Sequence, residues 1–179
     1  MNDIDEQNQR FIFDERWQVW KYDDSPDFRK QLMPQIQGSK AVDIVAIGPP
    51  NDDVYLIEIK DYRKDYKLRP AAEVVDAICA KVRDSFPGLI GTMRRGSGPE
   101  FLKTWLGQCC FSENPIKVVL WDEEQEADVD VKKARATILR KEIRRKLRWL
   151  NASVIIVGQC YESTLPGLSV KNLPGAGLL

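Results

Sequence analysis

The sequence of 179 residues contains no histidine. This absence excludes catalytic triads that pair serine or cysteine with histidine, zinc sites with histidine ligands, and nucleases in which a histidine activates water. The four cysteines include no C-x-x-C pair, which zinc ribbons and redox dithiols require. We therefore expect these thiols to be small apolar residues of a protein in a reducing compartment.

Long apolar runs and an excess of either charge are also missing. The longest uncharged run, Trp149 to Tyr161, is shorter than the roughly 18–20 apolar residues that span a bilayer. The first ten residues lack the basic and then apolar pattern of a signal peptide. The 27 basic residues balance 27 acidic ones, so no global field attracts a polyanion. The sequence predicts a cytoplasmic protein with no membrane partner, whose affinity for nucleic acid would depend on local segregation of charge.

Length and composition fit one folded domain, with 43% hydrophobic and 30% charged residues. We expect a flexible leader over residues 1–10, a single domain over 11–162 and a loop-like tail over 163–179. Residues 11–22 are rich in aromatic side chains, and their pattern fits either a strand or a short amphipathic helix. Residues 23–38 contain two prolines, so at most a short helix is expected there.

The clearest local signal is a pair of β-branched runs at 41–47 and 54–60, separated by the turn sequence GPPNDD. This pattern predicts a β-hairpin. Apolar residues then recur every three or four positions over 71–86, which predicts an amphipathic helix. We expect Pro87 and Gly88 to kink or restart this helix and the helix to end near Arg94. A shorter helix is expected over 99–106.

The second half of the chain alternates strands and a helix. The apolar runs at 116–121 and 153–157 predict buried strands of the kind found in parallel sheets. Between them, an apolar stripe predicts a long helix over about 131–150. The order is an N-terminal element followed by β-β-α-β-α-β, which predicts an α/β fold with a mixed sheet flanked by helices.

Three charged residues interrupt the apolar hairpin. Glu58 and Lys60 are two positions apart and therefore project from one face of their strand, while Ile57 and Ile59 project from the other. Asp43 lies on the preceding strand, and the hairpin brings it beside Glu58. An exposed edge pair with an unrelated carboxylate is the weaker alternative, because an unpaired charge within an apolar run is costly. We expect two carboxylates and one ammonium group to converge at one end of a sheet.

Such a group suits a divalent cation. Mg²⁺ takes a small number of carboxylate oxygens together with waters and phosphate oxygens. The bound ion lowers the pKa of a water and stabilises charge on phosphoryl oxygens, and a lysine beside it can orient that water. No histidine is needed. The pattern therefore predicts Mg²⁺ as the cofactor, with Mn²⁺ as a substitute.

The motif formed by Asp43 and by Glu58-Ile59-Lys60, within KAVDIVAIGPPNDDVYLIEIKDYR, resembles that of the PD-(D/E)XK nuclease superfamily, which has the restriction-endonuclease-like fold. The resemblance extends to the order of strands and helices over about residues 40–160. It implies that Asp43 and Glu58 bind Mg²⁺, that the backbone carbonyl of Ile59 completes the metal shell, and that Lys60 serves the attacking water.

Two positions depart from the pattern or leave it open. Val42 stands where the name-giving proline would be, a substitution that many members tolerate. The superfamily often adds an acidic residue from an early helix, and Glu15, Asp23 and Asp24 compete for that role. We take Glu15 as the first choice among the three.

Basic residues that could contact nucleic acid gather on two segments. The first directly follows the hairpin and contains Arg63, Lys64 and Lys67, which would leave the sheet at the edge of the metal site. The second is the helix over 132–148, with nine basic residues and one acidic residue. Its basic face consists of Lys133, Arg140, Lys141, Arg144 and Arg148. On the first long helix, Lys81 could approach the site. Solvated surface is the alternative for each segment.

These observations predict a Mg²⁺-dependent endonuclease, rather than an exonuclease, that hydrolyses phosphodiester bonds of DNA rather than RNA. One alternative is a catalytically degenerate module of the same fold that binds nucleic acid or a protein partner. Another is an interaction protein in which the acidic stretch 122–130 and the basic helix form a self-complementary interface. A homodimer or a larger complex is compatible with each of these functions.

Overall fold

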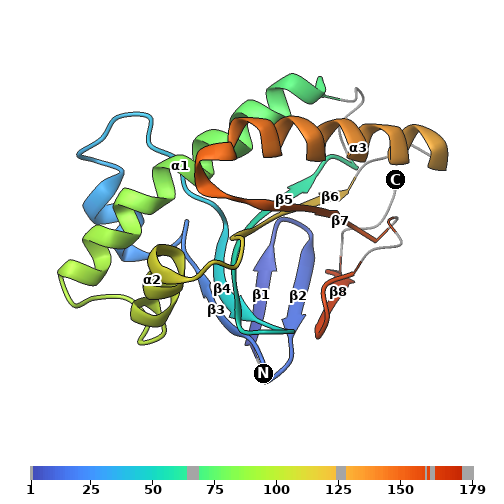
Figure 1. Cartoon of the computed structure of the whole chain (residues 1–179). Coiled ribbons are helices and arrows are strands. Elements are labelled where there is room, and N and C mark those ends of the chain that lie inside the picture. The colour runs from blue at the N-terminus through green and yellow to red at the C-terminus, as the bar shows by residue number, and fades with distance from the viewer. Residues whose placement is uncertain (1, 64–68, 124–127, 160, 162–163, 175–179) are drawn as a thin grey trace.

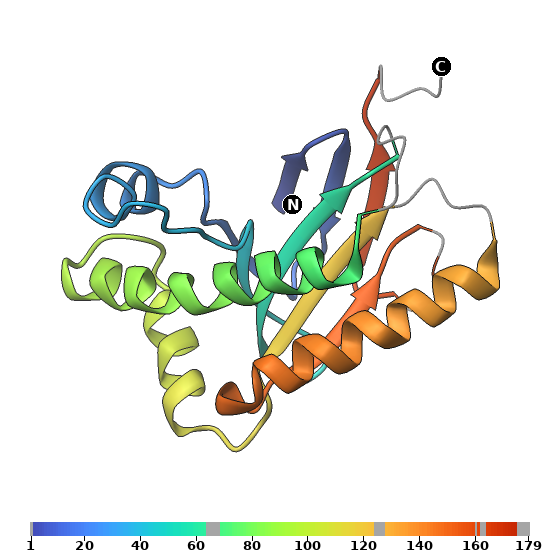
Figure 2. The ribbon, with the colours of Figure 1, turned by 90° about the horizontal axis from the view of Figure 1, so that it is seen from above.

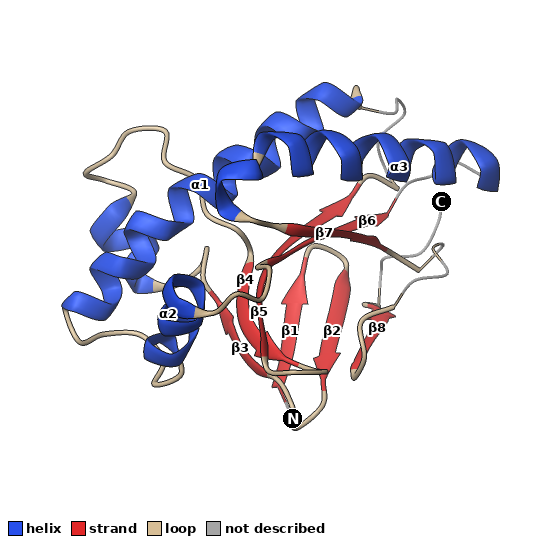
Figure 3. Ribbon diagram, viewed as in Figure 1, coloured by secondary structure: helices blue, strands red, loops and turns tan. Residues whose placement is uncertain are grey.

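The computed structural model describes residues 2–63, 69–123, 128–159, 161 and 164–174, which form two sheets and a layer of helices (Figure 1; Figure 3). The larger sheet contains β3 (Gln18–Lys21), β4 (Ile44–Gly48), β5 (Asp53–Asp61), β6 (Lys117–Glu123) and β7 (Ser153–Val157), in that spatial order. Strands β3, β4 and β5 are antiparallel neighbours, whereas β5, β6 and β7 run parallel. The predicted hairpin and the parallel strands are confirmed.

The helices follow the predicted apolar periodicity. They are α1 (Ala71–Arg94), α2 (Leu102–Phe111) and α3 (Val129–Lys146), with a π-helical turn η1 (Asp27–Leu32) and a 3₁₀ turn η2 (Arg148–Leu150). Helix α1 contains Pro87 and ends at Arg94, which is where the sequence predicted its end. Gly88 is required within this helix, because a Cβ atom at this position would lie 2.0 Å from the Tyr22 hydroxyl. Helix α1 therefore packs directly against the chain that leads into β4.

The two faces of the larger sheet are covered differently. Figure 2 shows α1 and α3 on one face and the β1–β2 hairpin on the other. Alternation along β5 supplies both cores, since Leu56 packs with α1, α2 and α3 while Ile57 and Ile59 pack toward the smaller sheet. The α/β class, with a five-stranded mixed sheet flanked by helices, is thus confirmed. None of the helices in the described part of the chain combines the length and apolarity needed to cross a membrane.

The chain termini differ from expectation. In place of a flexible leader over 1–10 and a loop-like tail over 163–179, the structure has β1 (Asn2–Glu6), β2 (Gln9–Phe13) and β8 (Leu168–Asn172). They form a three-stranded antiparallel sheet in the order β1-β2-β8. Phe11 and Phe13 of β2 are fully buried against the larger sheet. The aromatic segment 11–22 therefore contains strands rather than a helix, and the short helix expected between residues 23 and 38 is η1.

Candidate functional site

The candidate site lies where β4 stops pairing with β5. The last paired residues are Ile44 and Ile57, and β5 continues for four more residues beside β6 alone. Side chains replace the missing strand. The Ile59 amide donates to Asp43 Oδ2 at 2.6 Å. Gln7, in the turn between β1 and β2, donates to the Ile59 carbonyl at 3.2 Å and accepts from the Asp61 amide at 2.8 Å.

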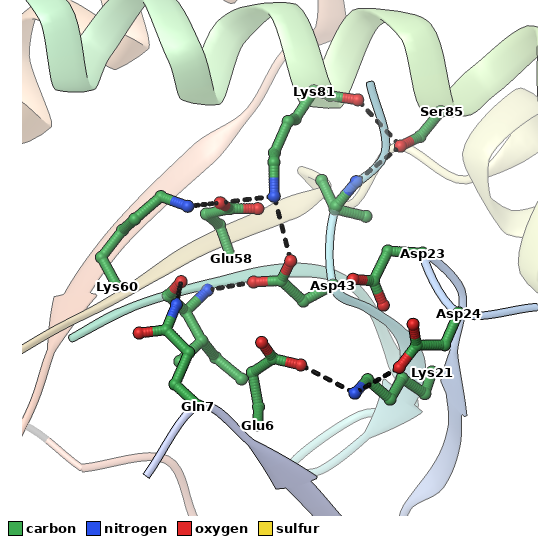
Figure 4. A network of polar contacts seen from close by, with 12 residues as sticks. Glu6, Gln7, Lys21, Asp23, Asp24, Asp43, Glu58, Lys60, Lys81 and Ser85 are labelled. Carbon is green, nitrogen blue, oxygen red and sulfur yellow. Dashed lines mark hydrogen bonds and ion pairs between the residues drawn. The ribbon is translucent and has the colours of Figure 1, made fainter. Parts of the chain in front are cut away.

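Four charged side chains meet at this point (Figure 4). The Lys81 ammonium from α1 lies 3.0 Å from Asp43 Oδ1 and 2.7 Å from Glu58 Oε1. The Lys60 ammonium also pairs with Glu58 Oε1. The structure therefore brings together the three residues predicted from sequence, Asp43, Glu58 and Lys60, and adds a second lysine that touches both carboxylates.

Glu58 is the most buried member of the group. Only 1% of the residue is exposed, against 4% for Asp43. Its Oε2 atom accepts no hydrogen bond from the described residues. Burial, followed by the charge of Asp43, raises the pKa of Glu58 to about 7, although Lys60 and Lys81 act in the opposite direction. This carboxylate thus has an oxygen available to a further cation.

Helix α1 fixes the position of Lys81. Ser85, one turn further along the helix, donates to the Lys81 carbonyl at 2.8 Å and accepts from the Val42 amide at 3.0 Å. This contact ties α1 to the residue that precedes Asp43. Burial would lower the pKa of Lys81, but Glu58 and Asp43 outweigh that effect and raise it above its usual value. Lys81, which we grouped with nucleic-acid contacts from the sequence, therefore lies within the carboxylate cluster itself.

A third carboxylate comes from Asp23, which directly follows β3. The Tyr22 amide donates to the Asp43 carbonyl at 2.9 Å, so the next residue lies beside Asp43 (Figure 4). Burial and then the charge of Asp43 raise the pKa of Asp23 to about 7. The Oδ1 atom of Asp23 is buried and accepts no hydrogen bond from the part of the chain that the structure describes. Asp23 is therefore a partly buried acid beside Asp43.

Two further acids surround Asp23. One oxygen from each of Glu6, Asp23 and Asp24 lies within 4.8 Å of the others. Lys21 forms ion pairs with Glu6 and Asp24. Glu15, the acid that we preferred from sequence, instead precedes β3 at the end remote from Asp43, because Gln18 pairs with Ile47 and Lys21 pairs with Ile44.

Gln7 and Glu6 were missed by sequence reasoning because they fall within the predicted leader. The pairing of β2 with β8 and the packing of Phe11 and Phe13 hold their turn at the site. These contacts are distant in sequence, so no local pattern indicates them. Asp23 was one of three acids that the sequence offered for this position. The pairing of β3 with β4 places Asp23 beside Asp43, and this pairing could not be predicted from the sequence.

The residues predicted to contact nucleic acid differ in exposure and in their bonds to other side chains. Arg63 donates to both oxygens of Asp61, at 2.8 and 2.7 Å, and to Asn172 Oδ1 at 2.7 Å. Lys64 and Lys67 lie outside the described residues. The remaining predicted contacts are exposed along α3 and η2, and they are Arg140, Lys141, Arg144 and Arg148. Helix α3 turns Leu139 and Ile143 toward the core, so its basic face points outward.

Comparisons of the chain with protein-family models, with curated proteins and with solved structures gave no match. The chemistry of the cluster follows from its own side chains. Buried carboxylates with uncommitted oxygens, next to two ammonium groups, suit a divalent cation and an anionic substrate.

Proposed function

We propose that this chain is a divalent-metal-dependent nuclease of the PD-(D/E)XK type that hydrolyses phosphodiester bonds of DNA. One observation carries the proposal. Asp43 and Glu58 meet where β4 leaves β5, with Lys60 beside them, and an oxygen of Glu58 is buried without a hydrogen-bond donor among the described residues. Buried polar atoms without partners are rare in folded proteins, and a bound ion, an ordered water or a catalytic role accounts for such an atom.

The architecture supports a restriction-endonuclease-like fold. Strands β4 and β5 form the hairpin that carries the motif, α1 follows and packs over it, and β6 lies parallel to β5. Helix α3 and β7 complete the β-β-α-β-α-β order. In an α/β sheet, the carboxyl ends of parallel strands are a common place for a functional site, and Glu58 and Lys60 lie at that end of β5.

The donor atoms fit Mg²⁺ or Mn²⁺, which prefer carboxylate and carbonyl oxygens. Asp43, Glu58 and the Ile59 carbonyl would hold the ion, with Asp23 beside Asp43. When bound, the ion supplies a water of lowered pKa and neutralises charge on the phosphate. Lys60 keeps 20% of its side chain exposed while its ammonium pairs with Glu58, so it can hold a water or a phosphate oxygen at the mouth of the site.

The metal site is tested by calorimetric titration of Mn²⁺. We expect saturable binding in the wild type that is lost in Asp43→Asn and in Glu58→Gln. Asp53→Asn is the matched control, because Asp53 is a buried acid at the other end of β5 and should leave binding unchanged. Binding that persists in both site variants, or a wild type that binds no Mn²⁺ even with a non-cleavable oligonucleotide, would contradict the proposal.

The exposed basic face of α3 supports contact with a phosphate backbone. Charge reversal of Arg140, Lys141, Arg144 and Arg148 together should weaken DNA binding and reduce the salt dependence of the binding constant. The expected change is about 0.9 in the logarithmic slope for each phosphate that the variant no longer neutralises. A control variant reverses Lys30 and Lys103, which are exposed on η1 and α2. Equal weakening in both variants would indicate a general charge effect instead of a site on α3.

A degenerate module of the same fold is the second candidate function. Lys81 already supplies a positive charge between Asp43 and Glu58, and this observation favours a cluster that is complete without a metal. Absence of Mn²⁺ binding and cleavage, with DNA binding retained, would be the outcome expected for such a module.

A further inference from the structure

Lys81 differs from Lys60 in what it touches. The Lys60 ammonium pairs with Glu58, whereas the Lys81 ammonium lies within 3.0 Å of an oxygen of Asp43 and within 2.7 Å of an oxygen of Glu58. Figure 4 shows Lys81 descending from α1 to the space that the two carboxylates share. The ammonium therefore lies at the point where a cation shared by these two ligands would be expected.

The position of Lys81 is set by a rigid element. Helix α1 buries Ile78 and Val82 on either side of it in sequence, and Ser85 bonds the helix to the Val42 amide. The backbone of Lys81 is thus held over the site. Its side chain keeps 20% exposure and has four rotatable carbon–carbon bonds, so the ammonium can move toward solvent while the helix stays in place.

Charge explains why the ammonium rests where it does. Asp43 and Glu58 are 4% and 1% exposed, and two buried carboxylates at close range repel each other strongly. A cation between them offsets that repulsion, and removing one partner of a buried pair is costly. Both oxygens of Asp43 already have donors, Lys81 at Oδ1 and the Ile59 amide at Oδ2. A divalent ion that binds Asp43 together with Glu58 would therefore meet the like charge of Lys81. The two cations therefore compete for one place.

We propose that Lys81 is the resident cation of this carboxylate pair and that a divalent ion must displace its ammonium in order to bind. The inference rests on the proposed function in that it assumes a metal site at Asp43 and Glu58. Lys81 then acts as a positioning residue. It keeps the carboxylates together in the metal-free protein, and it sets the metal concentration at which the site fills.

The test is calorimetric titration of Mn²⁺ into Lys81→Met, with Arg83→Met as the matched control. Arg83 lies on the same helix, exposed and paired with Asp84, so its variant removes one positive charge outside the cluster. Couplings between two bound species commonly amount to about 5- to 150-fold in affinity. We expect Lys81→Met to bind Mn²⁺ at least about tenfold more tightly than the wild type, and Arg83→Met to bind it as the wild type does.

Thermal unfolding gives a second readout that does not depend on activity. Without metal, Lys81→Met should have a lower Tm than the wild type, because two buried carboxylates are left without their counter-ion. Added Mn²⁺ should raise the Tm of Lys81→Met by more than it raises that of the wild type. Lys81→Gln removes the charge but keeps a hydrogen-bond donor for Asp43, and it serves the same comparison if Lys81→Met does not fold.

The outcomes separate this inference from the proposed function. Equal or weaker Mn²⁺ binding in both Lys81 variants, with binding in the wild type, would overturn the inference and leave the metal site standing. Binding only in the Lys81 variants would support the competition and show that the native protein is a degenerate module. Absence of binding in every variant, with or without a non-cleavable oligonucleotide, would overturn both.

Discussion

The two halves of β5 differ in what their side chains do, although both lie under the same layer of helices. The first half supplies core residues, and the second half supplies members of the charged cluster. In the first half, Asp53–Ile57 pairs with β4, and from Tyr55 onward the strand also pairs with β6. Leu56 in this half is fully buried against the helices. In the second half, β4 is gone, and the side chains of Gln7 and Asp43 bond to the free backbone edge. Charged residues thus follow apolar ones on one continuous face.

The two halves of β5 differ in what binds the backbone edge next to β4: the β4 backbone in the first half, and the side chains of Asp43 and Gln7 in the second. A fully paired strand leaves its side chains to fill space, so Leu56 contributes by packing. At the unpaired end, Asp43 serves the backbone through Oδ2 and the cluster through Oδ1. The departure of β4 therefore opens room for carboxylates near the sheet and supplies backbone groups that orient them. Leu56, a core residue, and Glu58, a member of the cluster, are two positions apart because the pairing of β5 with β4 ends between them, at Ile57.

The largest expected contrast comes from one substitution at each end. Leu56→Ala should lower the free energy of unfolding by about 2–5 kcal/mol, because it leaves a cavity in a packed core. Glu58→Gln should instead raise it, by up to about 3 kcal/mol at pH 8, because the neutral amide avoids the cost of a buried carboxylate whose pKa is raised to about 7. Urea denaturation of both variants measures this. A decrease in Glu58→Gln equal to that in Leu56→Ala would mean that the cluster is chiefly structural.

The free energy of unfolding should depend on pH through Glu58, which lies in the half of β5 that does not pair with β4. The pKa of Glu58 rises from its ordinary value of 4.5 to about 7, so the folded protein holds this proton more tightly than the unfolded chain. The free energy of unfolding of the metal-free protein should therefore fall as pH rises from about 4.5 to about 7, and then level off. One pKa unit corresponds to about 1.4 kcal/mol, so the fall from Glu58 is at most about 3 kcal/mol.

Asp23, whose pKa is also raised to about 7, adds to the fall in the same direction. Acids with a lowered pKa, such as Asp61, are ionised in both states across this range and add no slope. Urea denaturation at pH 5.5, 6.5 and 7.5 gives the slope, and Glu58→Gln should reduce it. An unchanged slope in that variant would assign the effect to other groups.

The smallest expected effect concerns the side chain that replaces β4. Gln7→Ala removes hydrogen bonds to the Ile59 carbonyl and the Asp61 amide, and each is worth about 1 kcal/mol. The Asp61 amide should also exchange with solvent faster, as hydrogen-exchange measurements would show. Asn8→Ala is the neighbouring control, because Asn8 donates only to the Asp61 side chain in the described structure. Equal protection of the Asp61 amide in both variants would contradict this role of Gln7.

The hairpin and its motif could be predicted because their signals are local. Alternation placed Glu58 and Lys60 on one face, and the turn sequence brought Asp43 close. The small sheet could not be predicted in this way. Its strand Asn2–Glu6 contains one apolar residue, Ile4, so no alternation of apolar and polar residues marks it as a strand. Its strand β2 pairs with β8, where Phe13 lies opposite Leu168, and these residues are far apart in the sequence.

The choice among acids failed for a similar reason. Glu15 and Asp23 flank the four residues of β3, and the sequence left open whether this segment was a strand or a helix. Only the register of Lys21 opposite Ile44 puts Asp23, and not Glu15, beside Asp43. Lys81 was foreseen near the site, but its contact with both carboxylates depends on the rotation of α1, which Ser85 and Gly88 fix through contacts with distant residues.

The cluster is assembled from segments that span Glu6 to Lys81, and no short stretch of the chain contains it whole. A cation bound there is consequently a ligand of the folded state of the entire protein and not of a local loop. Occupancy and global unfolding are then linked, so that a ligand at one hundred times its Kd adds about 2.7 kcal/mol to the free energy of unfolding. A simple melting curve would therefore report which ions and oligonucleotides occupy the site, before any substrate is known.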